Sequence, residues 1–98
     1  MRKNTLVVVS KMTELTNYSD ELRSADTSNE KVFQELLNSG MKLMMMNDED
    51  IAHQFGVSRP TVTRWRNGKN APHPAMRKVI FNWLRKRAEK FALAPAGR

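Results

Sequence analysis

Residues 47–67 read NDEDIAHQFGVSRPTVTRWRN and carry the strongest structural signals in the chain. Asn47 has the character of a helix N-cap, and Asp50 three residues later completes a capping box. Apolar residues then recur at helical spacing until Gly56, which supplies the positive φ that ends many helices. Ser58 is a second N-cap. We therefore expect two short helices joined by a tight turn.

The second of these helices, predicted over residues 59–67, has one apolar side and one polar side. Val62 and Trp65 are three residues apart and indicate the buried side, where core packing is favoured over stacking on a base. Pro60 is tolerated in the first turn, because its missing N–H would have no intrahelical partner there. The residues left for the outer side are Arg59, Thr61, Thr63, Arg64 and Arg66.

A longer amphipathic helix is predicted to begin at Glu30, after a small polar linker that ends in the N-cap Asn29. Gly40 interrupts its apolar stripe and leaves two interpretations. It either ends the helix or lies inside it and allows a neighbour to pack closely. The stripe consists of Val32, Phe33, Leu36, Leu37, Met41 and Met44.

The N-terminal segment is less sharply defined by its pattern. Residues 1–9 contain the apolar run Leu6–Val9, which is compatible with a short strand or with the start of a helix. Residues 10–23 predict an amphipathic helix through Met12, Leu15, Tyr18 or Ser19, and Leu22. We expect Leu6–Val9 to contribute to dimerisation, with a place in the core as the alternative.

The last predicted helix runs from Pro74 to about Phe91 and closes the core. A basic amphipathic helix that binds a membrane surface is the less favoured alternative. We expect three parts in the chain: an N-terminal extension (1–28), a compact domain (29–92) and a tail (93–98). The predicted apolar stripe is Met76, Val79, Ile80, Trp83, Leu84, Ala88 and Phe91, and the predicted polar stripe is Arg77, Lys78, Asn82, Arg85, Lys86, Glu89 and Lys90.

The charge of the chain is concentrated in its second half. The 98 residues carry a net charge of +7, and residues 58–98 hold 11 Lys or Arg and one acid, Glu89. Such a balance favours a polyanionic partner. Cysteine is absent, which excludes disulfides and thiolate metal sites. We expect no enzyme activity, catalytic residue, metal or cofactor, because no nucleophile set, ligand cluster or phosphate-binding glycine loop is present.

The outer side of helix 59–67 matches the chemistry of a DNA major groove. Arginine pairs with guanine through two parallel hydrogen bonds, and threonine contacts bases through its hydroxyl or methyl group. We therefore expect base reading by Arg59, Thr61, Thr63 and Arg64. Phosphate contacts form commonly at helix ends and in loops. The residues expected to make them are Ser58, Arg66, Asn67 and Lys69.

These residues resemble the DNA-binding domains of the lambda repressor and Cro, the Xre-like helix-turn-helix family. The shared pattern is Ile51-Ala52, Gly56-Val57-Ser58, Val62, Arg64-Trp65 and Asn67-Gly68-Lys69, and part of it is also similar to the phage lambda activator CII. The resemblance covers roughly residues 30–85. It implies an all-α, lambda repressor-like bundle of about four to five helices and the base and phosphate contacts named above.

The chain departs from this family at three points. Asp48 stands where the family often has glutamine, Pro60 stands where it often has a polar reader, and one long helix replaces the usual two after the motif. This leaves the N-terminal segment free to complete the core or to build a dimer.

We expect a cytoplasmic, nucleoid-associated transcriptional regulator that binds double-stranded DNA as a homodimer, a repressor rather than an activator, with no membrane partner. The alternatives are an antitoxin-type module that binds a protein partner and autoregulates, and a non-specific nucleic-acid binder.

Overall fold

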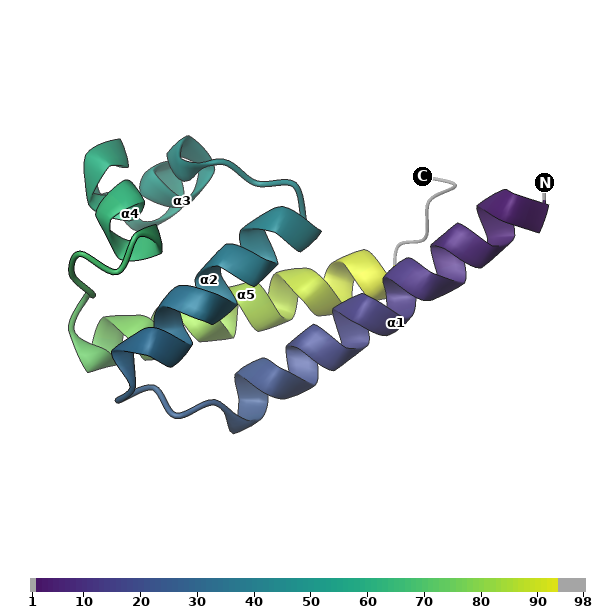
Figure 1. Ribbon diagram of the computed structural model, residues 1–98, viewed down its shortest axis with the longest axis horizontal. Helices are drawn as coiled ribbons and strands as arrows, with labels where there is room; N and C mark the ends of the chain where they lie inside the picture. Colours follow the sequence, from purple (N-terminus) through teal and green to yellow (C-terminus); the bar gives the residue numbers. More distant parts are fainter. Residues whose placement is uncertain (1, 94–98) are drawn as a thin grey trace.

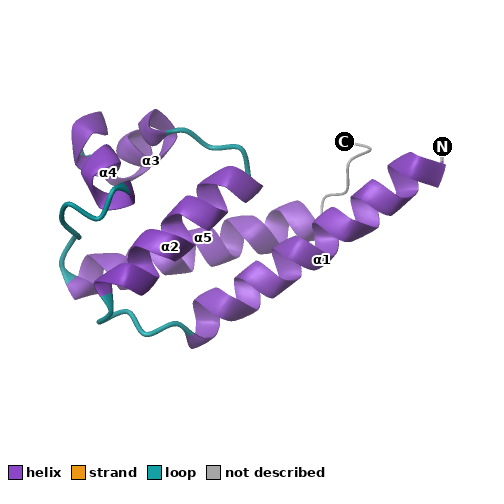
Figure 2. Cartoon of the chain, viewed as in Figure 1, coloured by secondary structure: helices purple, strands orange, loops and turns teal. Residues whose placement is uncertain are grey.

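The computed structural model describes residues 2–93, which form five helices and no strand (Figure 1). The helices are α1 (Arg2–Ser24), α2 (Glu30–Leu43), α3 (Asp48–Phe55), α4 (Arg59–Arg66) and α5 (Pro74–Leu93). The three longer helices α1, α2 and α5 pack along one another, and the short helices α3 and α4 pack together beside α2 (Figure 1). Short loops connect all five (Figure 2). The predicted all-α class is confirmed.

The starts of α2, α3 and α4 follow from the capping residues that the sequence predicts. The Asn29 side chain accepts a hydrogen bond of 3.0 Å from the backbone N–H three residues on. Asn47 and Asp50 form a reciprocal capping box, with two hydrogen bonds of 2.9 Å. The Ser58 hydroxyl accepts a 3.2 Å bond from the third backbone N–H after it. Each bond satisfies an amide that would otherwise lack an intrahelical partner.

The N-terminal segment is helical from its second residue, because α1 begins at Arg2. Leu15, Tyr18 and Leu22 are buried in the same core that contains residues of α2, α4 and α5. Completion of the core, one of the two roles left open for this segment, is therefore fulfilled by the second half of α1. The side chains of Leu6–Val9 and residues 94–98 of the predicted tail lie outside the described residues.

Gly40 lies inside α2, and Tyr18 of α1 fills the space beside it. The Tyr18 hydroxyl donates a 2.6 Å hydrogen bond to the carbonyl of Leu36. A Cβ atom on Gly40 would collide with that hydroxyl and stand 2.7 Å from the ring carbon Cζ. Burial, with a contribution from the charge of Glu21, raises the pKa of Tyr18 well above its usual value, so the hydroxyl keeps its proton. Close packing is thus the role of this glycine.

The face of α5 that meets the core differs from the predicted one. The predicted stripe placed Val79 and Phe91 inside, but Val79 is 55 % exposed and Phe91 is exposed as well. Phe81, which the stripe omitted, is buried and stacks on Phe33 of α2 with ring centroids 5.8 Å apart. Ile80, Leu84 and Ala88 of the predicted stripe are buried, and Met76 and Trp83 pack against the core, so the prediction is wrong only for Val79, Phe91 and the omitted Phe81. The difference arises because α5 packs against α1 and α2 together, and their positions decide which side faces inward. The buried residues of α5 are Arg77, Ile80, Phe81, Leu84 and Ala88.

Arg77, which was predicted on the polar side, is only 4 % exposed. Its Nε donates to the carbonyl of Pro72 at 2.8 Å, and its Nη1 donates to the carbonyl of Thr27 at 2.7 Å. Its Nη2 lies 3.5 Å from the Glu30 carboxylate. A buried guanidinium is tolerated when its N–H groups have acceptors, so Arg77 ties the α1–α2 connection to the α4–α5 connection.

Glu89 fastens α1 to the second half of α5. Its Oε2 accepts hydrogen bonds from Arg23 at 2.6 Å, Ser19 at 3.0 Å and Arg85 at 3.1 Å. The hydrogen bonds from Arg23 and Ser19, together with Arg85, hold the pKa of the Glu89 carboxyl below its usual value. The single acid of residues 58–98 is therefore committed to a contact between helices.

Candidate nucleic-acid interface

A three-residue connection joins α3 to α4. Gly56 adopts φ 67°, in the left-handed region that favours glycine, and its amide donates to the carbonyl of Ala52. A Cβ there would meet nothing within 4 Å, so the backbone conformation rather than space calls for glycine. Val57 packs against the core and Ser58 caps α4. The chain thus turns sharply enough for α4 to pack directly on α3.

The inner side of α4 is anchored in the core by the two predicted residues. Val62 is fully buried and Trp65 is 4 % exposed. The Trp65 ring meets Phe33 of α2 edge-on, with centroids 6.0 Å apart and planes at 76°. Such aromatic pairs contribute beyond the area that they bury. The prediction that Trp65 packs in the core is confirmed.

The outer side of α4 and the residues that follow it present exposed cations. Arg59, Arg64 and Lys69 are exposed. Among the described side chains, which are those of residues 11–92, none of these three forms a hydrogen bond or an ion pair. No acidic residue occurs between residues 58 and 69. This end of the molecule therefore offers unneutralised positive charge in a geometry set by the buried side of α4.

The remaining polar residues of this surface are partly engaged with each other. The hydroxyl oxygens of Ser58 and Thr61 lie 2.7 Å apart, in a hydrogen bond that either can donate. Ser58 is exposed and Thr61 is half-buried. Asn67 is exposed at the C-cap of α4, where its amide donates to the carbonyl of Thr63. Ser58 and Asn67 thus mark the two ends of the helix, next to the cations.

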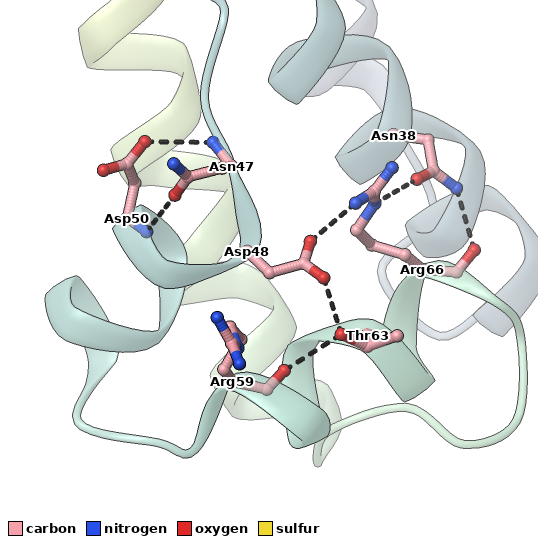
Figure 3. Close-up of polar contacts among 7 residues, drawn as sticks. All are labelled: Asn38, Asn47, Asp48, Asp50, Arg59, Thr63 and Arg66. Carbon is pink, nitrogen blue, oxygen red and sulfur yellow. Dashed lines mark hydrogen bonds and ion pairs between the residues drawn. The ribbon is translucent and has the colours of Figure 1, made fainter.

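Two of the predicted contact residues, Thr63 and Arg66, turn toward Asp48 at the start of α3 (Figure 3). The Thr63 hydroxyl donates to Oδ2 of Asp48 at 2.5 Å, and Nη1 of Arg66 donates to Oδ1 at 2.6 Å. The Nε of Arg66 also donates to Oδ1 of Asn38 in α2 at 2.8 Å. Both oxygens of the Asp48 carboxylate are therefore occupied.

The surroundings of Asp48 favour its charged form. Partial burial acts to raise the pKa of the Asp48 carboxyl, but the hydrogen bonds from Thr63 and Arg66 and the charges of Arg66 and Arg59 outweigh it. The pKa consequently lies below its usual value. The negative charge of Asp48 is therefore balanced by Arg66 of the neighbouring helix.

The backbone of α4 is also fixed to α2, through the carbonyl of Arg66. It accepts hydrogen bonds of 2.9 Å from Gln34 Nε2 and from Asn38 Nδ2. Gly68 follows at φ 74°, and a Cβ there would lie 2.9 Å from the Gln34 side chain. Gln34 and Asn38 therefore set the angle of α4 on α2, a role that sequence reasoning missed because nothing local marks it.

The eight predicted contact residues consequently fall into two groups. Six face solvent or cap α4, and two bond to Asp48. The six are Ser58, Arg59, Thr61, Arg64, Asn67 and Lys69, and the two are Thr63 and Arg66.

Neither a metal site nor a membrane-spanning helix is found in the part of the chain that the structure describes. It contains no group of three or more His, Cys, Asp or Glu side chains placed to hold a metal ion. Among its helices, none has the length and apolar character needed to cross a bilayer. Comparisons with family models, with curated proteins and with solved structures found no match for this chain.

Proposed function

We propose that this protein is a sequence-specific transcriptional regulator that binds double-stranded DNA, with α3 and α4 as a lambda repressor-like helix-turn-helix and α4 in the major groove. One observation carries the proposal. Val62 and Trp65 fix one side of α4 in the core, while Arg59 and Arg64 are exposed and form no ion pair with any described side chain. A helix held in this way can enter a groove while Val62 and Trp65 stay packed in the core.

The main base contacts are assigned to Arg59 and Arg64. Each guanidinium can donate two hydrogen bonds to the O6 and N7 atoms of a guanine, a pairing worth about 1–3 kcal/mol of discrimination. Thr61 at the edge of the same surface is a further reader. The hydroxyl of Thr63 already donates to Asp48, so its share in base reading is smaller.

Phosphate contacts are assigned to the flanks of α4, chiefly to Lys69 after its C-terminus and to the exposed polar groups of Ser58 and Asn67. Contacts of this kind set the register of a protein on the duplex without reading sequence. The net charge of +10 over residues 58–98 supports the same partner, because neutralised phosphates release counterions. Association with the nucleoid would follow from this affinity.

We further propose that the protein acts as a homodimer and as a repressor. A single short helix reads only a few base pairs, whereas specific sites are bound about 10³ to 10⁷ times more tightly than random DNA. Two copies on half-sites about 34–36 Å apart would supply the missing contacts. A chain that is monomeric both free and on its preferred DNA, by analytical sedimentation, would overturn this part.

The experiment that tests the proposal is selection from a pool of random duplexes, followed by anisotropy titration of the enriched site against scrambled DNA at two salt concentrations. We expect a palindromic enriched site, preferred about 10³-fold or more. A double variant, Arg59→Gln with Arg64→Gln, should abolish this preference. Lys86→Gln with Lys90→Gln is the matched control, because it removes the same charge from exposed positions on α5.

The possible outcomes separate the proposal from its rivals. Equal binding of all duplexes that collapses as salt rises would indicate a non-specific nucleic-acid binder. Absence of duplex binding would direct the search to a protein partner. Equal loss of preference in the two double variants would show that total charge, rather than the outer side of α4, determines recognition.

A further inference from the structure

We propose that Asp48 is a positioning residue of this interface: an internal counter-ion that withholds Arg66 and Thr63 from DNA and leaves base reading to Arg59 and Arg64. The inference rests on the proposed function and deepens it. It states which cations of the helix-turn-helix are available to DNA and which residue makes that selection.

The geometry around Asp48 supports this role (Figure 3). Its carboxylate lies between α3 and α4, with a side chain only 18 % exposed. One oxygen accepts from Arg66 at 2.6 Å and the other from Thr63 at 2.5 Å. Each oxygen of Asp48 is therefore engaged within the protein, and the carboxylate occupies two groups that could otherwise approach the duplex.

The charge around Asp48 divides the cations of α4 into two kinds. Arg66 forms an ion pair with the carboxylate. Among the described side chains, those of Arg59 and Arg64 form no hydrogen bond or ion pair, although the charge of Arg59 also favours the charged form of Asp48. A phosphate gains little from a cation that is already neutralised, and the nearby carboxylate repels it. The number of phosphates that the protein neutralises should therefore be about one lower than the number of cations on this surface suggests.

The charge of Asp48 is not what holds α4 in place. The backbone carbonyl of Arg66 is bound by Gln34 and Asn38, and neither bond involves the carboxylate. Asn38 also accepts from Nε of Arg66, so the guanidinium keeps one positional contact if Asp48 loses its charge. An asparagine at position 48 retains an oxygen that can accept from Thr63 or Arg66. Charge and structure can thus be separated by one substitution.

The test compares Asp48→Asn with Glu49→Gln. Both remove one negative charge from the first turn of α3, but Glu49 is exposed and forms no ion pair with the described side chains of residues 11–92. Binding to the enriched site and to a scrambled duplex is titrated over a range of salt concentrations, and thermal melts confirm that each variant folds. The double variant Asp48→Asn with Arg66→Gln is measured in parallel.

We expect the plot of log affinity against log salt to be steeper by about 0.9 for Asp48→Asn than for Glu49→Gln, the increment of one added phosphate contact. Its affinity gain should grow about threefold for each fourfold reduction in salt. A phosphate contact reads no sequence, so the gain should be similar for both duplexes and the preference for the enriched site should stay nearly unchanged. The added Arg66→Gln change should remove the extra slope.

Equal slopes for Asp48→Asn and Glu49→Gln would overturn the inference while the proposed function stands. An extra slope that persists in the double variant would overturn the assignment to Arg66. Lack of duplex binding by the unaltered protein would overturn the proposed function and this inference together, and the three results are distinguishable from one another.

Discussion

The ring of Tyr18 occupies the space that a side chain on Gly40 would need, so α1 and α2 touch through a position that only glycine fits. We expect Gly40→Ala to lower the free energy of unfolding, because overpacking costs about 1–3 kcal/mol. The clash involves a ring carbon as well as the hydroxyl, so this cost should exceed the helix-propensity gain of about 1 kcal/mol. Urea unfolding measures the effect. Ser39→Ala, at the exposed neighbouring position, is the control and should not destabilise.

Removal of the Trp65 side chain should unfold the protein rather than alter recognition alone. Trp65 is buried against Phe33, and truncation of a large core aromatic costs about 3–5 kcal/mol. We expect Trp65→Ala to lose most of its cooperative thermal transition, whereas Arg59→Ala on the exposed side should stay within about 0.5 kcal/mol of the unaltered chain. An unchanged melting temperature for Trp65→Ala would contradict the anchoring role.

Arg64→Ala should weaken binding to the preferred site by about 1–3 kcal/mol and relax sequence preference at one position of each half-site. The reason is that α4 is anchored in the core, while the Arg64 guanidinium on this helix is exposed and forms no ion pair with any described side chain. Repeating the selection from random duplexes with the variant measures the preference. Lys86→Ala removes the same charge from α5 and should leave the preferred sequence unchanged. Equal weakening of random and specific DNA by Arg64→Ala would show that Arg64 is not a reader.

Lys69→Ala should lower the affinity for DNA without changing the sequence preference. Lys69 follows the C-terminus of α4 and is exposed, a position suited to a phosphate rather than to a base edge. We expect the salt slope to become shallower by about 1, with a similar loss of affinity for enriched and scrambled duplexes. Anisotropy titration at several salt concentrations gives both quantities. A change in preferred sequence would place Lys69 among the readers instead.

Acid should loosen the contact between α1 and α5. The hydrogen bonds from Arg23 and Ser19 lower the pKa of Glu89 in the folded chain, so its stabilising effect is present above the ordinary glutamate pKa of about 4.3. The effect is lost as the pH falls through the lower, folded value. We expect the urea midpoint of the unaltered protein to drop as the pH falls below about 5, and that of Glu89→Gln to drop less. An equal drop in both would show that Glu89 does not contribute.

Local signals in the sequence were sufficient to predict α2, α3 and α4. Asn29, the pair Asn47 and Asp50, and Ser58 each act within three residues, so their caps are visible before the fold is known. The inner side of α4 was equally accessible, because Val62 and Trp65 are separated by nearly one helical turn.

Features that depend on distant partners were not predictable. The inward side of α5 is set by α1 and α2, which is why Val79 was placed wrongly and Phe81 was omitted. Asp48 bonds to residues 15 and 18 positions away, so a sequence pattern could only mark its charge as an anomaly. The partners that engage Thr63 and Arg66 emerge only when α3 and α4 are placed together.

The attachment of α4 to α2 through the carbonyl of Arg66 has a consequence for how this protein could evolve. The side-chain amides of Gln34 and Asn38 donate to a backbone carbonyl oxygen, an atom that every amino acid has. The exposed residues Arg59 and Arg64 can therefore be replaced by other amino acids without breaking these hydrogen bonds between α2 and α4. A lineage built on this scaffold could acquire new target preferences through one or two substitutions while its folding stability stays nearly constant.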